Sequence, residues 1–241
     1  MAPFSRWSRV TQWVFYLWTA VGFLVVPFNL TEDRLRLALA STGLGDVAGS
    51  ILNGSDAIWL WLGAITTLAA YAAEISWTRA WAGALGLGGA AAAIELIGVA
   101  TGFPFGPYAY TDRLGPRLGS VLPVTIPAAW YIIVANGHAL VPATRWRPVF
   151  VGLIAVGTDL SLEAVAWKIR GYWEWYPGQA LKPGWPPWQN YASWFLVGAA
   201  LDWVFLRRLD LPRLRWRAAA VLTVMNLLFW GTVLTNFLGR A

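Results

Sequence analysis

Residues 80–102 read AWAGALGLGGAAAAIELIGVATG, an apolar run interrupted by one carboxylate, Glu95. The run is long enough to cross a bilayer core, which is about 30 Å thick and needs about 20 helical residues. A carboxylate at the centre of such a helix costs about 2.5–3.5 kcal/mol on insertion scales, so it usually marks a substrate path, a proton relay or an active site. Asp159 and Glu163 interrupt a second apolar stretch. Three acids in such segments predict chemistry inside the membrane.

The composition is that of a polytopic membrane protein. Of the 241 residues 58% are hydrophobic and 12% charged, and the mean hydropathy is +0.52. These values predict an all-α membrane helical bundle, residues 1–241 forming a single integral membrane domain. Hydropathy predicts about seven transmembrane helices, at 10–28, 57–76, 80–102, 120–141, 148–168, 190–206 and 217–238. The first, rich in Trp and Tyr, is expected to be a retained span rather than a signal peptide. Residues 35–52 are too broken to span, and we expect a short interfacial helix there.

The net charge of +6 comes from cations between the apolar runs, which indicates membrane topology rather than nucleic-acid binding. An odd number of spans places the termini on opposite sides. The N-terminal side then carries ten cations and the other side eight, which favours a cytoplasmic N-terminus in a bacterial or archaeal cell membrane. The chain contains no Cys, which excludes disulfides and thiolate chemistry.

Two aromatic loops fall on one side of the membrane in this topology. One covers residues 102–110 (GFPFGPYAY), and the other runs from 171–176 (GYWEWY) to 186–194 (PPWQNYASW). Because their Pro and Gly residues stop helices and impose turns, the loops can roof a cavity with Tyr and Trp faces.

The three acids are expected to lie beneath that roof. At about 1.5 Å per residue, Glu95 lies about 10–12 Å below the end of its span, Asp159 about 13 Å and Glu163 about 7 Å below theirs. Asp159 and Glu163 share a helix face at i, i+4, and Glu95 shares its face with small residues that allow close helix packing. Two neighbouring carboxyls in low dielectric do not readily both ionise, so one is expected to keep its proton and form an acid–base pair with another. The structural alternative is that each acid is neutral and only bonds a carbonyl or an indole N–H.

The motifs resemble a known family. Residues 95–110 (ELIGVATGFPFGPYAY), 114–116 (LGP), 159–163 (DLSLE), 171–175 (GYWEW) and 187–194 (PWQNYASW), with Pro123, Pro127 and Trp130, are similar to membrane carotenoid biosynthesis proteins of the CruF type. That family includes carotenoid 1,2-hydratases and bisanhydrobacterioruberin hydratases. The similarity covers about residues 90–200, and Ala164 stands where we expect the family to have proline.

This resemblance implies addition of water to the terminal C1=C2 double bond of an acyclic carotenoid end. The alkene needs a desolvated proton donor, and the tertiary cation needs aromatic faces and an attacking water. We expect Asp159 to donate the proton, and Glu163 or Glu95 to hold the complementary charge and the water. The expected substrate-binding residues are Phe105, Tyr108, Tyr110, Trp130, Tyr131, Trp173, Trp175, Asn190 and Trp194; Asn190 has helix capping as an alternative role.

No metal or cofactor is expected, and the single histidine, His138, lies near the far end of its span. The expected partners are a lycopene-like or C50 carotenoid, the lipid bilayer and other enzymes of the carotenoid pathway. A retinal protein is excluded because neither lysine, Lys168 or Lys182, lies in the last span. A related enzyme without net hydration, a proton-coupled transporter and a carotenoid-binding protein stay open.

Overall fold

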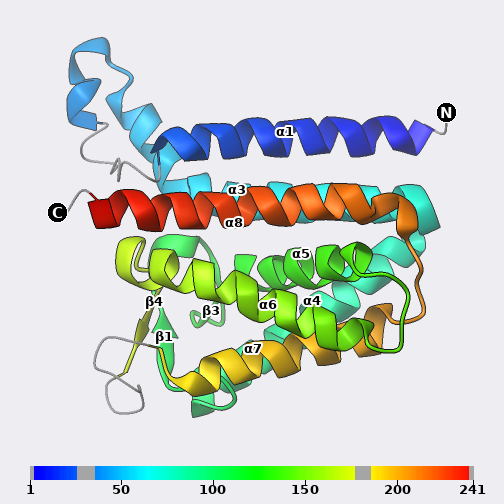
Figure 1. Ribbon diagram of the computed structural model, residues 1–241. Helices are drawn as coiled ribbons and strands as arrows, with labels where there is room; N and C mark the ends of the chain where they lie inside the picture. Colours follow the sequence, from blue (N-terminus) through cyan, green and yellow to red (C-terminus); the bar gives the residue numbers. More distant parts are fainter. Residues whose placement is uncertain (1–2, 26–35, 177–185, 239–241) are drawn as a thin grey trace.

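The protein is described from a computed structural model, which covers residues 3–25, 36–176 and 186–238. Long helices run alongside one another through the molecule (Figure 1). They are α1 (Pro3–Val25), α3 (Gly45–Ile75), α4 (Trp77–Thr101), α5 (Thr125–Leu140), α6 (Arg147–Glu163), α7 (Trp188–Leu201) and α8 (Arg215–Leu238). Two π-helical segments, η3 (Ala164–Ile169) and η4 (Asp202–Leu206), continue α6 and α7. The short 3₁₀ segments are η1 (Ala40–Thr42), η2 (Asp112–Leu114) and η5 (Pro212–Leu214).

The predicted all-α membrane bundle is confirmed in class. Among the described residues, four helices are long and apolar enough to cross a membrane, namely Gly54–Ile75, Trp77–Thr101, Arg147–Ile169 and Pro212–Leu238. The spans expected at α1, α5 and α7 are helical but fall outside this set, so length and composition do not establish seven crossings. The separate interfacial helix expected at 35–52 is wrong from residue 45 onward, because Gly45–Leu52 is the first part of the continuous helix α3.

Small strands connect the helices at one end of the bundle. β1 (Tyr108–Tyr110) pairs antiparallel with β4 (Trp173–Trp175), and β2 (Arg117–Leu118) pairs with β3 (Leu122–Pro123). α4 ends where Gly102 adopts a left-handed conformation (φ 73°) and donates its N–H to the carbonyl of Gly98 at 2.8 Å. The pairing of β1 with β4 joins the two aromatic loops in one two-stranded sheet.

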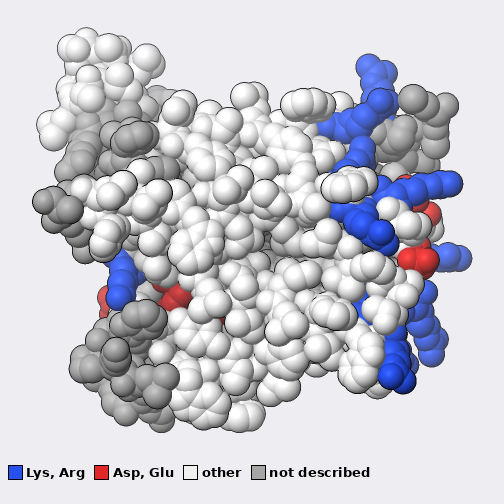
Figure 2. All heavy atoms as spheres, in the orientation of Figure 1, with Lys and Arg blue, Asp and Glu red and all other residues white. Residues whose placement is uncertain are grey.

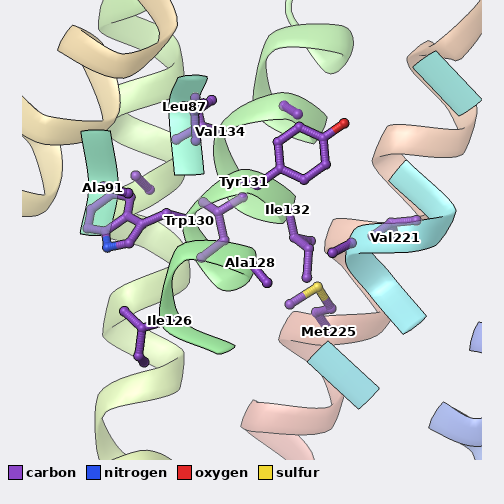
Figure 3. Packing of buried hydrophobic residues seen from close by; sticks show 14 of the residues in the cluster. Leu87, Ala91, Ile126, Ala128, Trp130, Tyr131, Ile132, Val134, Val221 and Met225 are labelled. Carbon is purple, nitrogen blue, oxygen red and sulfur yellow. The ribbon is translucent and has the colours of Figure 1, made fainter. Parts of the chain in front are cut away.

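Helix α5 lies in the middle of the bundle and contacts α3, α4, α6 and α8. Nearly all of its residues are buried. Figure 3 shows Trp130 and Tyr131 leaving α5 in different directions, Trp130 toward Ala91 of α4 and Tyr131 away from it. Successive residues of a helix are about 100° apart, so the two rings belong to different parts of the core.

Cations gather at the end of the bundle opposite the β1–β4 sheet (Figures 1 and 2). α1, α6 and α8 begin at that end with Arg6, Arg147 and Arg215 in or near their first turns. Three cations of the sequence-based count, Arg34, Lys182 and Arg240, lie outside the described residues.

Candidate active site

Glu95 of α4 is held by three donors from two other segments. Its Oε2 accepts hydrogen bonds from the hydroxyls of Tyr108 at 2.5 Å and Tyr110 at 2.8 Å, and its Oε1 accepts from Trp130 Nε1 at 2.7 Å. Glu95 is only 4% exposed. Tyr108 and Tyr110 face the same side because strand side chains alternate. Hydrogen bonds to a buried carboxylate are among the stronger ones in proteins, so this arrangement stabilises negative charge on Glu95.

The phenols remain neutral donors. Burial, followed by the nearby Glu95 carboxylate, raises the pKa of both Tyr108 and Tyr110 above the ordinary value. Both hydroxyls therefore keep their protons at neutral pH.

Glu163 ends α6 and accepts from the other strand of the same sheet. Its Oε1 receives the indole N–H groups of Trp173 at 3.0 Å and Trp175 at 2.6 Å. The antiparallel register sets Tyr108 opposite Trp175 and Tyr110 opposite Trp173. One two-stranded sheet therefore supplies both tyrosines to Glu95 and both indoles to Glu163, so the two acids lie against the same face of that sheet.

Asp159 lies one helical turn before Glu163 and is fully buried. Its Oδ2 accepts from Asn190 Nδ2 at 2.8 Å, and its Oδ1 has no hydrogen-bond partner among the described residues. Asn190 stands in the first turn of α7, with Pro187 immediately before that helix. The amide side chain of Asn190 binds the acid, and no side-chain cap is formed at the start of α7.

A small cavity of about 50 Å³ lies between these groups. Glu95, Glu163 and Asn190 line it together with seven aromatic residues from both loops and two helices. The aromatic members are Phe105, Tyr108, Tyr110, Trp130, Trp173, Trp175 and Trp194. The rings of Trp130 and Trp194 stack with centroids 4.3 Å apart. The cavity volume exceeds the ~10–15 Å³ that one water requires, and the carboxyl oxygens of Glu95 and Glu163 can accept hydrogen bonds from such a water.

Most expected site residues meet at this cavity, and two do not line it. Asp159 lies behind Asn190, and Tyr131 points elsewhere with its hydroxyl unpaired among the described residues. Sequence reasoning missed Ile126, Ala129 and Leu162, which supply the apolar wall. The available signal was the spacing of Ile126, which is i, i+3 with Ala129 and i, i+4 with Trp130 and therefore lies near the helix face of both.

His138 belongs to a different cluster near the other end of α5. Its Nδ1 lies 2.6 Å from Asp202 Oδ1, its Nε2 lies 3.0 Å from Arg147 Nη1, and Arg147 also donates to the carbonyl of Leu209 at 2.6 Å. These contacts join α5, α6 and the segment after α7. In the described part of the chain, no group of three His, Cys, Asp or Glu side chains is arranged to hold a metal ion.

Comparison with known proteins gives a family match over most of the chain. Residues 56–239 match a family model described as carotenoid biosynthesis protein. The chain is also 33% identical over 132 residues to a bisanhydrobacterioruberin hydratase from Haloarcula japonica. That alignment covers 52% of this chain and 44% of the relative, so the chain matches less than half of the relative's length. No solved structure matches.

Proposed function

Because the chain belongs to the carotenoid biosynthesis protein family, we propose that it adds water across the terminal C1=C2 double bond of an acyclic carotenoid. The observation that carries this proposal is one aromatic cavity lined by two acids, Glu95 and Glu163, at the end of the bundle where the loops meet. The hydratase relative supports the reaction type.

The aromatic walls suit a cationic intermediate. Protonation of C2 leaves a tertiary cation at C1, and ring faces stabilise cations most strongly where water is excluded. Trp130, stacked on Trp194, and Trp175, in contact with Tyr108 at a 5.3 Å centroid distance, offer such faces. Their indole N–H groups are used by Glu95 and Glu163, so the rings are held in fixed orientations.

The acids divide the proton transfers. We assign the proton donor to the Asp159–Glu163 pair, with Glu163 as the member that reaches the cavity, because two carboxyls one turn apart in low dielectric readily share one proton. Both indole donors end on Oε1 of Glu163, and we assign the transferred proton to Oε2. The oxygen of the water then bonds to C1 while Glu95 accepts a proton from that water. Return of this proton from Glu95 to the Asp159–Glu163 pair completes the cycle.

The reaction in this form needs only water and the carotenoid, with no metal or cofactor. We further propose that the chain is one domain whose seven long helices all cross the cell membrane, with the N-terminus in the cytoplasm. The gathering of arginines at the end where α1 begins supports this orientation (Figure 2). The acid cavity then opens in the outer half of the bilayer, where other carotenoid-pathway enzymes can pass substrate through the lipid.

Expression in a bacterium that accumulates lycopene tests the proposal. The extracted pigments of the wild type should gain the mass of one or two waters. Glu95→Gln, Asp159→Asn and Glu163→Gln should abolish this product while the protein still inserts. Glu174→Gln is the matched control, since Glu174 lies between Trp173 and Trp175 on β4 but is exposed.

The outcomes separate the candidate functions. Pigments of unchanged mass with a changed absorption spectrum would indicate a carotenoid-modifying enzyme that adds no water. Unchanged pigment bound to a correctly inserted protein would indicate a carotenoid-binding or transport role. Full activity in all three acid variants would rule out the acid–base mechanism.

A further inference from the structure

A second, larger cavity adjoins the acid cavity. It has a volume of about 340 Å³, within the range of about 300–1,000 Å³ typical of small-molecule sites. Its walls come from α1, α3, α5 and α8, with Trp173 of β4 and Tyr172 just before that strand. Along α3 it extends from Ala48 to Leu60, about 18 Å at 1.5 Å per residue.

The two cavities share part of one wall. Ile126, Ala129, Leu162 and Trp173 line both of them. Ala129 is partly exposed although its neighbours Ala128 and Trp130 on α5 are buried. That exposure is to cavity space, because α5 lies in the middle of the bundle. The two cavities are therefore adjacent at Ala129, the smallest side chain of the shared wall.

The lining leaves little for a polar ligand to bind. Trp18 Nε1 donates to the carbonyl of Ser55 at 3.2 Å, and Trp59 Nε1 donates to Thr19 Oγ1 at 2.8 Å. Asp56 accepts from Arg170, with Nε at 2.9 Å. The polar groups at the wall are already paired, and the remaining lining is aliphatic or aromatic. Such a site selects a hydrocarbon, because a polar ligand would lose its bonds to water without replacement.

We propose that this larger cavity, which we call the chain channel, holds the polyene chain of the carotenoid while its end group reaches Glu95 and Glu163. The proposal rests on the proposed function for the identity of the substrate. The outer rim includes Val21 and Ile51, each 52% exposed on the apolar flank of the bundle, so a hydrocarbon enters from the side of α1 and α3.

Helix α1 is a part of the channel wall that lies outside the family match. The family match begins at residue 56, and α1 ends at Val25. Trp18, Val21 and Gly22 of α1 face the channel. A Cβ placed on Gly22 would lie 3.5 Å from Leu228 Cδ2, an ordinary contact, so a larger side chain there extends into the channel. A side chain added on α1 should therefore narrow the channel.

Two blocking variants test the channel from opposite walls. Gly22→Phe enters from α1 and Ala48→Phe from α3. Gly89→Phe is the matched control, because Gly89 is exposed on α4 and its Cβ would meet nothing within 4 Å. Each full-length protein is purified, checked for a single gel-filtration peak, and mixed with lycopene. The circular dichroism induced in the visible absorption of lycopene measures binding independently of turnover.

The wild type and Gly89→Phe should bind lycopene with equal affinity. Both blocking variants should bind it with an affinity at least about tenfold lower, because a hydrophobic pocket discriminates by about that factor against a single added methylene. Hydration in lycopene-accumulating cells should fall in parallel. If one blocking variant fails to fold, the other decides.

Failure of the channel can be told from failure of the hydratase assignment. Hydration by the wild type with equal lycopene binding in all four proteins would overturn the channel and leave the hydratase standing. Loss of binding in the blocked variants without hydration in any protein would support the channel and refute the hydratase. A wild type that hydrates lycopene without an induced signal would mean that another hydrocarbon, such as a lipid acyl chain, fills the cavity, which also refutes the channel.

Discussion

Replacing Tyr108 by Phe removes one oxygen from the acid site and little else. The hydroxyl lies 2.5 Å from Glu95 Oε2, whereas the ring, which also contacts Phe105 and Trp175 at centroid distances of 6.2 and 5.3 Å, is retained. Tyr110 and Trp130 still donate to Glu95. The variant therefore weakens the stabilisation of charge on Glu95 without opening a cavity.

The expected cost follows from the kind of hydrogen bond that is lost. A hydrogen bond to a charged group contributes about 1.5–3 kcal/mol. At about 1.4 kcal/mol for each factor of ten, turnover should fall about 10- to 150-fold. The raised pKa of Tyr108 adds a second expectation. The hydroxyl stays protonated well above neutral pH, so the ratio of wild-type to variant rates should be constant from about pH 6 to pH 9.

The assay is the rate of hydrated pigment formation in membranes that contain equal amounts of folded protein. Tyr176→Phe is the control, because Tyr176 directly follows β4, the strand paired with that of Tyr108, but is 55% exposed. It should hydrate like the wild type. A Tyr108→Phe rate within twofold of the wild type would refute the assignment of Glu95 as the charged acid. A rate ratio that changes across the pH range would refute the neutral-donor role.

Two further variants probe the packing around the site and away from it. Gly98→Ala should lower the hydration rate about tenfold, because its Cβ would lie 2.9 Å from Phe105 Cδ2 and 3.2 Å from the Tyr108 hydroxyl. Gly89→Ala should have no effect, and equal hydration rates in the two variants would contradict this expectation. His138→Phe should lower the thermal midpoint of unfolding, since Asp202 Oδ1 would lose its hydrogen-bond partner and an unsatisfied buried polar group costs about 1–3 kcal/mol. Hydration per folded molecule should stay at the wild-type level, and a lost rate with unchanged thermal stability would argue against this structural role.

Sequence patterns predicted the membrane helices because that signal is local. Apolar runs of sufficient length predicted α4, α6 and α8 as spans, and their bounds differ from the expected ranges by only a few residues. Helical periodicity also predicted that Asp159 and Glu163 share a face. The continuation of α3 back to Gly45 was not predicted, because the polar and small residues at 45–54 weaken the apolar signal there although they are compatible with a helix.

The site was predicted only in part, because sequence patterns describe neighbouring residues and not contacts between distant segments. Trp130 and Tyr131 were both expected to bind the substrate, although successive helical residues point about 100° apart and only Trp130 lines the acid cavity. The strands were missed because the loops carry Gly and Pro, which signal turns more strongly than a three-residue strand does.

The sequence by itself determined that this chain forms apolar helices carrying three acids, and that aromatic loops follow two of those helices. Both properties depend on neighbours within a few residues. Only the tertiary structure decided which donors serve which acid. Tyr108 pairs with Trp175, 67 positions along the chain, and this register gives the tyrosines to Glu95 and the indoles to Glu163. Pairing of distant segments depends on how the helices pack, and no local periodicity encodes it.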